Sequence, residues 1–270
     1  MIVCIILIAL LLLYFILVCP NLSRKKETLS FNENLYAHRG FFDDKSEAPE
    51  NTMLAFKKAI ENGYGIELDV HVTKDLKCIV CHDDDLKRIA GIDKKICEIT
   101  FNEIKNVNVY NTNEKIPSLE DVLNLVNGQV SLVVEIKSIT NAFKETEIIS
   151  RVLDKYKGKY CIESFNPLVL LWYKKHKSNV IRGQLSTNYK NDNVSGNRFR
   201  NFLLTFLLFN IVTKPDFIAY NIDYKKNISF LVCTKIYNIS GFAWTVKNQS
   251  ELNDSRNYYN VFIFQDFIPK

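Results

Sequence analysis

Acidic side chains interrupt two segments of this chain that are otherwise apolar. Glu67 and Asp69 alternate with Ile, Leu and Val, and Glu135 stands in a second run of Leu, Val and Ile. Because successive side chains of a β-strand point to opposite faces, Glu67 and Asp69 share one face. Burying a carboxylate is costly unless it is paired with a cation or bound to a metal. An edge strand with one solvated face would explain one such segment, but two segments with the same pattern favour a buried acidic site.

Two of the four histidines stand where predicted strands end. His38 precedes Arg39 and Gly40, and His82 precedes Asp83. A single His at a strand end is commonly a structural residue. Two of them beside an acidic cluster indicate an acid–base pair, because imidazole exchanges protons near neutral pH.

Short apolar segments alternate with amphipathic ones through most of the chain. The predicted strands are 35–38, 66–72, 78–82, 132–137, 160–165, 181–185, 217–221, 241–246 and 261–266. The predicted helices are 51–62, 118–126, 144–156, 167–176, 200–211 and 249–256. This alternation predicts a parallel sheet, and eight or nine strands in about 240 residues favour a closed (β/α)8 TIM barrel. Nine strands are predicted and the barrel has eight, so one predicted strand is the arm of a hairpin or is wrongly assigned.

The amino-terminal end differs from the rest. Residues 1–20 contain no Lys, Arg, Asp or Glu, which predicts one transmembrane anchor through the ~30 Å hydrocarbon core. A cleaved secretory signal is the alternative, but basic residues before the apolar run and a small-residue cleavage site are both missing. The basic residues 24–26 follow at once, so the positive-inside rule predicts a single-pass protein of the cell membrane with its catalytic domain on the cytoplasmic side. We assign 21–34 to a linker and 35–270 to the barrel.

Composition excludes other classes of protein. With 35 basic and 30 acidic residues, the net charge of +5 is too small to indicate a nucleic-acid partner.

Cys78, Cys81 and His82 match the spacing of covalent haem attachment. This chemistry needs an exported domain, and the two Cys fall on opposite faces of a predicted strand. We therefore interpret both Cys as packing residues.

One later segment is unusually apolar. Residues 198–214 carry Phe202 and Phe206 on one helical face, with Leu side chains widening the stripe. The segment is too short to span a bilayer. It is either an ordinary barrel helix or an interfacial helix that brings the barrel to lipid headgroups.

The order of these motifs resembles the glycerophosphodiester phosphodiesterase family, in a membrane-anchored bacterial form. The resemblance covers about residues 35–270 and rests on Tyr36-Ala37-His38-Arg39-Gly40, Ala48-Pro49-Glu50-Asn51-Thr52, Glu67-Leu68-Asp69-Val70, Val80-Cys81-His82-Asp83, Glu135-Ile136-Lys137, Glu163-Ser164-Phe165-Asn166-Pro167, Arg182-Gly183-Gln184-Leu185 and Ala243-Trp244-Thr245-Val246. Near the carboxyl terminus Gln265-Asp266 stands where the family often has Thr-Asp, and Lys247 replaces a frequent Asn.

The resemblance implies a TIM barrel and a role for each motif. It implies His38 and His82 as the acid–base pair and Glu67, Asp69 and Glu135 as ligands of one divalent cation. It implies Arg39, Lys137, Glu50 and Trp244 as the residues that bind the substrate or support that binding. Three carboxylates suit Mg²⁺ or Ca²⁺ better than Zn²⁺. Which His is the acid, and whether a cyclic phosphate forms, stay open.

Three functions follow as expectations. The first is metal-dependent hydrolysis of glycerophosphodiesters to glycerol 3-phosphate and an alcohol. The second is a lysophospholipase D-like or phosphoinositide-type phosphodiesterase that acts on a membrane lipid with the same site. The third is a degenerate, membrane-tethered binding barrel without activity, although every expected site position is filled.

Overall fold

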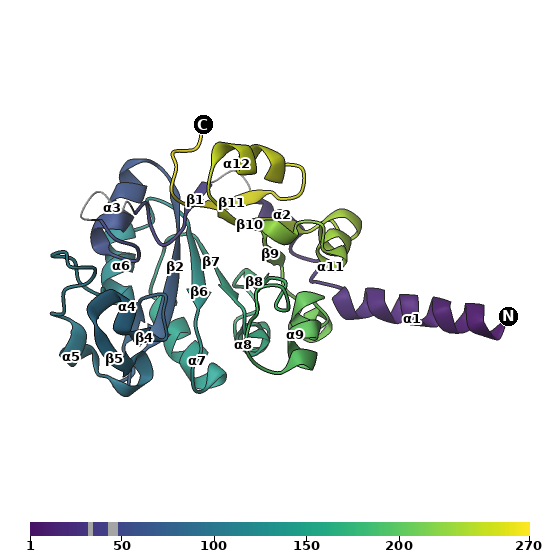
Figure 1. Cartoon of the computed structure of the whole chain (residues 1–270), viewed down its shortest axis with the longest axis horizontal. Coiled ribbons are helices and arrows are strands. Elements are labelled where there is room, and N and C mark those ends of the chain that lie inside the picture. The colour runs from purple at the N-terminus through teal and green to yellow at the C-terminus, as the bar shows by residue number, and fades with distance from the viewer. Residues whose placement is uncertain (32–34, 43–47) are drawn as a thin grey trace.

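The computed structural model describes residues 1–31, 35–42 and 48–270, and its main body is a closed barrel (Figure 1). The eight parallel barrel strands are β1 (Leu35–Ala37), β2 (Gly65–Val72), β6 (Leu132–Ile136), β7 (Tyr160–Ser164), β8 (Arg182–Ser186), β9 (Phe217–Asn221), β10 (Ser240–Val246) and β11 (Val261–Phe264). Strand β1 pairs with both β2 and β11, which closes the sheet. The predicted TIM barrel is confirmed.

The ninth predicted strand is a hairpin arm. Strand β3 (Cys78–Val80) pairs antiparallel with β2 and leaves the barrel closed without it. Beyond β3 lies an insertion that the sequence did not predict as folded structure. It contains β4 (Asp85–Leu86), α4 (Lys87–Ala90), β5 (Ile92–Lys95), η1 (Ile96–Glu98) and α5 (Phe101–Ile104), and it has an apolar cluster of its own.

Helices cover the outside of the barrel. They are α3 (Met53–Glu61), α6 (Leu119–Val126), α7 (Ala142–Leu153), α8 (Pro167–His176), η2 (Ile222–Tyr224), α11 (Ile228–Leu231), η3 (Val232–Ile236) and α12 (Gln249–Ser255). Capping side chains accept backbone N–H bonds where α3, α6 and α7 begin, at Thr52, Ser118 and Asn141. The apolar face of β2 packs among residues of these helices, which turns Glu67 and Asp69 toward the barrel interior.

The apolar segment 198–214 does not form one helix. The prediction of a single continuous helix over 200–211 is therefore wrong. It forms α9 (Arg198–Thr205) and α10 (Asn210–Thr213), separated by a turn in which Leu207 has a φ of 55°. Leu207 is buried in the main core, and burying it there requires the chain to turn after α9. The outward side of α9 still carries apolar side chains, with Phe202 51% exposed.

The predicted transmembrane anchor over 1–20 is corrected by the structure. Helix α1 (Ile2–Val18) has 17 residues, and within the described parts of the chain no helix is both long and apolar enough to cross a membrane. Seventeen residues rise about 26 Å, less than the ~30 Å of a hydrocarbon core. The helix stops because Cys19 precedes Pro20 and takes an extended conformation.

The last turn of α1 docks on the barrel and the rest projects from it (Figure 1). The Tyr14 hydroxyl lies 2.8 Å from the Ser229 hydroxyl, and the Tyr237 hydroxyl donates to the Phe15 carbonyl. The Asn210 side chain donates to the carbonyl of Val18. The helix is therefore fixed at one end, while the apolar side chains of its first three turns lie exposed.

The segment 21–34, which we expected as a linker, packs on the barrel as far as it is described. Its helix α2 (Lys25–Leu29) lies against the amino end of the barrel. The Arg24 guanidinium donates there to the carbonyls of Ser178 and Asn179. Phe31 is 2% exposed and belongs to the apolar cluster inside the barrel. Residues 32–34 lie outside the described residues.

Candidate active site

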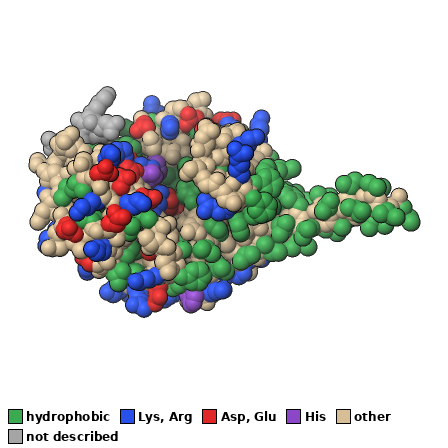
Figure 2. Space-filling view, turned by 60° about the horizontal axis from the view of Figure 1, so that its bottom comes forward, with side chains coloured by type: hydrophobic (Ala, Val, Ile, Leu, Met, Phe, Trp, Pro, Cys, Tyr) green, Lys and Arg blue, Asp and Glu red, His purple; other side chains and the backbone are tan. Residues whose placement is uncertain are grey.

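The sequence-predicted site residues gather at the carboxyl end of the barrel strands, the end where TIM barrels hold their active sites. Glu67 and Asp69 come from β2, Glu135 from β6, and Trp244 from β10. The other five lie on the segments that follow β1, β3 and β6: His38, Arg39, Glu50, His82 and Lys137. Figure 2 shows acidic and basic side chains gathered beside a His side chain on this part of the surface.

Three buried carboxylates form the centre of the site. Oxygen atoms of Glu67, Asp69 and Glu135 lie within 4.8 Å of one another, and the residues are 2%, 1% and 7% exposed. The Lys137 ammonium bridges two of them, at 3.0 Å from Asp69 Oδ1 and 2.7 Å from Glu135 Oε1. Arg39 Nε lies 3.5 Å from Asp69 Oδ2. Among the described residues, two cations therefore face three carboxylates.

The crowding is visible in the pKa values of these carboxyls. Burial, together with the neighbouring carboxylates, raises the pKa of Glu67 well above its usual range and that of Glu135 to about 7. Burial opposes ionisation at Asp69 too, but Lys137, His82 and Arg39 hold its pKa well below the usual range. A divalent cation among these oxygens would offset the repulsion, so the residues fit a metal such as Mg²⁺ or Ca²⁺.

His38 lies on one side of the carboxylates. Its Nδ1 is 2.5 Å from Gln265 Oε1, and its Nε2 is 3.9 Å from Glu67 Oε2. Burial and the neighbouring Arg39 lower the pKa of His38 to about 3, so its ring is neutral at pH 7. An amide oxygen at Nδ1 requires a proton there, which leaves Nε2 as the free nitrogen facing the site.

His82 interacts electrostatically with Asp69 of the triad, and its ring is held by a carboxylate. Its Nδ1 is 2.8 Å from Asp83 Oδ1, so its Nε2 is also the nitrogen left for chemistry. Burial lowers the pKa of His82, while the charges of Asp69 and Asp83 act in the opposite direction. Asp83 itself stays ionised, because hydrogen bonds from Arg88 and His82 outweigh its burial and lower its pKa to about 2.

A tight turn after β1 brings the first motif to the carboxylates. Arg39 and Gly40 both have left-handed backbone conformations, with φ of 56° and 85°. A Cβ on Gly40 would lie 2.9 Å from the Ala55 Cβ, so the turn has no room for another residue type. The turn directs the Arg39 backbone N–H to Glu67 Oε2 at 3.0 Å and its guanidinium to Glu50 Oε2 at 2.8 Å.

Aromatic rings form the wall beyond the carboxylates. Phe165 makes edge-to-face contacts with Trp244 and Tyr189, at ring-centroid distances of 5.5 and 6.3 Å. The indole N–H of Trp244 and the hydroxyl of Tyr189 are both buried without a hydrogen-bond partner among the described residues. The site thus combines a charged side with an aromatic side.

Sequence reasoning missed four residues of this site. Glu163 is paired in register with Glu135, is 2% exposed, and its Oε2 has no hydrogen-bond partner among the described residues. Gln265 was noted only as a departure from the family pattern, and Asp83 and Arg88 were given no role. The alternation in 160–165 gave a usable signal for Glu163, because it places Glu163 on the same face as Cys161, which lies inside the barrel.

The cysteines near His82 are packing residues, as predicted. Cys78 and Cys81 are 1% and 3% exposed and lie in two different apolar clusters, one on each side of β3. Burial raises the pKa of both thiols to about 12, so they are protonated at neutral pH.

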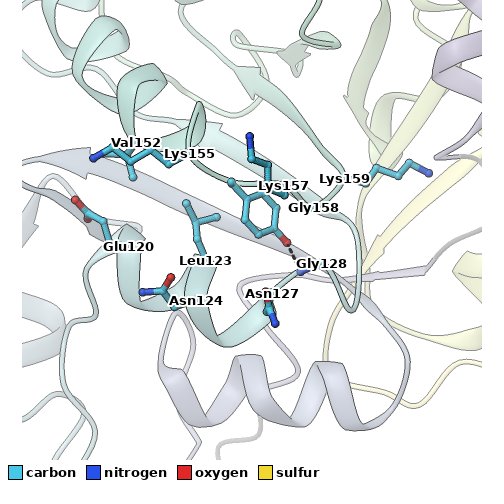
Figure 3. Close-up of a pocket in the computed structure, with 11 residues that line it drawn as sticks. Glu120, Leu123, Asn124, Asn127, Gly128, Val152, Lys155, Lys157, Gly158 and Lys159 are labelled. Carbon is cyan, nitrogen blue, oxygen red and sulfur yellow. Dashed lines mark hydrogen bonds between the residues drawn. The ribbon is translucent and has the colours of Figure 1, made fainter.

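A separate cavity lies at the opposite end of the barrel, between α6 and the loop that enters β7 (Figure 3). Lys155, Lys157 and Glu120 line it, and the Gly128 N–H donates to the Tyr156 hydroxyl at 3.1 Å. None of the nine predicted site residues lines this cavity, so the chemistry belongs to the carboxyl end.

A closed parallel barrel with buried carboxylates and two histidines at its carboxyl end defines a TIM-barrel protein with a candidate metal-binding site. Residues 38–270 match the glycerophosphoryl diester phosphodiesterase family, and the chain belongs to this family.

Individual relatives agree with this assignment. The chain is 34% identical to a glycerophosphodiester phosphodiesterase of Bacillus altitudinis over 128 residues, which is 45% of this chain and 51% of the relative. It is 35% identical to a human lysophospholipase D over 92 residues, 34% of this chain and 28% of that protein. The chain thus spans about half the length of the first relative and less than a third of the second. Its fold is similar to that of an Oleispira antarctica phosphodiesterase solved with its product sn-glycerol 3-phosphate, with a TM-score of 0.71, 19% identity, and coverage of 88% and 94%.

Proposed function

We propose that this protein hydrolyses glycerophosphodiesters to glycerol 3-phosphate and an alcohol in a metal-dependent reaction. The observation that carries the proposal is the buried carboxylate triad with two imidazoles close by: His38 Nε2 lies 3.9 Å from Glu67 Oε2, and the charge of His82 lowers the pKa of Asp69. A phosphodiester is anionic and resists nucleophiles, so its hydrolysis needs positive charge at the phosphoryl oxygens and proton transfer at two oxygens. The site offers both.

Each group of residues has a place in this reaction. Glu67, Asp69 and Glu135 would hold the divalent cation, which when bound neutralises phosphoryl oxygens and lowers the pKa of the attacking hydroxyl. Arg39 and Lys137 stand beside the triad, within reach of an anionic phosphate placed there.

The two histidines divide the proton transfers. One of His38 and His82 takes a proton from the attacking hydroxyl through Nε2, and the other returns one to the departing alkoxide. Glu50 accepts from Arg39 and fixes the guanidinium. Trp244 and Phe165 form an apolar surface for the organic part of the substrate.

A direct assay tests the proposal. The full chain in mild detergent is incubated with glycerophosphocholine and with a lysophospholipid, each with and without EDTA. Release of glycerol 3-phosphate from glycerophosphocholine that EDTA stops supports the proposal. Turnover of only the lysophospholipid favours the second candidate, and no turnover of either favours the binding barrel.

The second candidate is a phosphodiesterase that acts on a lipid within the bilayer. It is supported by the similarity to a human lysophospholipase D and by the apolar helix that projects from the barrel. A phosphoinositide-type activity would use the same residues, so the substrate alone separates these alternatives.

We further propose that α1 attaches the barrel to a lipid surface without crossing it. Hydrophobic side chains cover the projecting helix and the part of the body next to it (Figure 2). Leu7 and Leu11 are 59% and 56% exposed, and Ile228 on the neighbouring α11 is 60% exposed. A helix with apolar side chains all round is normally buried, and contact with lipid would remove this surface from water.

Lipid binding gives a measurable prediction. We expect the full chain to float with liposomes containing anionic lipid, and Leu7→Asp/Leu11→Asp to bind more than about tenfold more weakly, since a buried charge opposes entry into lipid. Leu168→Asp, at a 47% exposed apolar residue of α8, is the matched control and should bind like the wild type. Phe199→Ser/Phe202→Ser measures the separate contribution proposed for 198–214. A wild type that stays unbound and elutes as a dimer would show that α1 pairs with a second copy.

The orientation of the protein stays a prediction. The basic residues 24–26 next to α1 favour the anionic cytoplasmic leaflet, which motivates a catalytic domain on the cytoplasmic side of the cell membrane. Protease digestion of intact cells, compared with lysed cells, tests it, because a cytoplasmic barrel is cleaved only after lysis.

A further inference from the structure

Arg88 makes a fork of hydrogen bonds at the edge of the active site. Its Nε lies 2.6 Å from Asp83 Oδ2 and its Nη2 lies 3.1 Å from Asp83 Oδ1. The same Nη2 lies 2.6 Å from Glu50 Oε1, and Nη1 lies 3.1 Å from the Tyr110 hydroxyl. The residue belongs to α4 in the insertion after β3, so one side chain ties this insertion to the barrel.

The two carboxylates that Arg88 contacts each hold a residue of the proposed chemistry. Asp83 Oδ1 lies 2.8 Å from His82 Nδ1, and Glu50 Oε2 lies 2.8 Å from Arg39 Nη1. Arg88 thus reaches the partner of an acid–base histidine and the partner of a phosphate-binding arginine at once. Within the described parts of the chain, its hydrogen bonds go to Asp83, Glu50 and Tyr110 and not to the carboxylate triad.

We infer that Arg88 is a positioning residue that fixes the imidazole of His82 through Asp83 and the guanidinium of Arg39 through Glu50. The inference rests on the proposed function for the roles of His82 and Arg39. With its Nδ1 bound to Asp83, His82 presents Nε2 to the substrate, and Asp83 cannot rotate away while Arg88 holds both of its oxygens.

The chemistry of the contact calls for Arg. A planar guanidinium presents several N–H donors in a fixed fork and can hold two carboxylates in one geometry, whereas the ammonium of Lys acts as a point charge. The Tyr110 hydroxyl closes the arrangement by donating to Glu50 Oε1 at 2.7 Å. Glu50 and Asp83 are 12% and 24% exposed, while Arg88 is 48% exposed and covers them from the solvent side.

The competing explanation is that Arg88 only stabilises the insertion against the barrel. The pKa of His82 separates this structural role from the positioning role. The charges that face His82 are Asp69 and Asp83, which favour its protonated form, and Lys137 and Arg39, which oppose it. Arg88 neutralises Asp83 without touching the His82 ring. Loss of the Asp83 charge should therefore lower the pKa of His82, and loss of Arg88 should raise it.

The test measures both consequences in the full chain. The pKa of His82 is followed by NMR of labelled histidine side chains in detergent micelles. The chain has four histidines, and the His82 signal is assigned by its absence in His82→Gln. We expect Arg88→Leu to raise this pKa and Asp83→Asn to lower it, each by about half to one pH unit. We also expect Arg88→Leu to lower kcat/KM by about 10–100-fold, the cost of a misplaced reactive group. Arg88→Lys should give a smaller pKa shift but recover little activity.

Lys87 provides the matched control, because it lies in the same helix and pairs with Asp93 on the surface at 3.3 Å. Lys87→Leu should leave both readouts at wild-type values. The inference is overturned if Arg88→Leu leaves the His82 pKa unchanged, whether or not its melting temperature falls. Arg88→Lys and Asp83→Asn give the same readout where Arg88→Leu does not fold. A wild type without phosphodiesterase activity would contradict the proposed function, while opposite pKa shifts would still support the positioning contact.

Discussion

Glu67→Ala and Asp69→Ala should each abolish hydrolysis at micromolar Mg²⁺ or Ca²⁺. Removing one carboxylate from a shell of three weakens metal binding and activity together, by more than about 100-fold, since even the outer partners of metal ligands are worth about 10–100-fold. The fold should survive Glu67→Ala, because that substitution removes one of several like charges crowded in a buried site. Asp69→Ala should lower the melting temperature more, because it also removes a partner of Lys137 and Arg39. Calorimetric titration with each metal, beside the rate assay, measures both effects.

Glu61→Ala is the control for this experiment. Glu61 ends α3 and lies at the surface, 58% exposed, 3.9 Å from Lys57. Its replacement should change neither metal affinity nor rate. Full activity of a well-folded Glu135→Ala protein in EDTA would contradict a metal site built from these carboxylates.

The barrel and the acidic site could be predicted from sequence because both depend on local periodicity. Alternation in 65–72 and 132–137 placed Glu67, Asp69 and Glu135 on inward faces, and regular strand–helix alternation specified a parallel closed sheet. The antiparallel β3 was among the nine predicted strands, since a short hairpin arm has the same apolar pattern as a barrel strand.

Other features depend on contacts between distant parts of the chain. The break after α9 follows from the burial of Leu207, which no periodicity in 198–214 indicates. Phe31 enters the barrel from a polar stretch, and Gln265 meets His38 across the closing seam between β1 and β11. Such contacts arise only when the barrel closes, so a single sequence carries no local signal for them.

The end of α1 shows a further limit. Composition alone cannot separate a helix of 17 residues from one long enough to span a bilayer when the apolar run continues to Cys19 and Pro20. The observed end depends on the extended residue before Pro20 and on the hydrogen bond from Asn210 to the Val18 carbonyl. The first cause is readable from sequence and the second is not.

His38→Ala and His82→Ala should each lower the rate by about 10²–10⁴-fold, the usual contribution of a positioned proton-transfer group. Metal affinity should change little, because each ring is held at Nδ1 by Gln265 or Asp83 and neither belongs to the carboxylate group. The measurement is metal titration by calorimetry alongside kcat. If His82→Ala lost its metal but kept its rate per bound metal, His82 would be a ligand and not a proton-transfer group.

His176→Ala is the control that separates this loss from a general effect of removing a histidine. His176 stacks on Trp172 at the end of α8, and its Nδ1 lies 3.0 Å from the Trp172 carbonyl. Its contacts among the described residues are with Trp172 and not with the site, so its replacement should leave kcat and metal affinity unchanged even if the melting temperature falls. Because the His38 ring is buried and neutral whereas His82 is bound to a carboxylate, the two active-site variants should also differ in their pH–rate profiles. A bell-shaped pH–rate profile has one side set by the catalytic base and the other by the catalytic acid. Each variant should lose the side that its missing imidazole sets, and identical profiles for both variants would contradict separate acid and base roles.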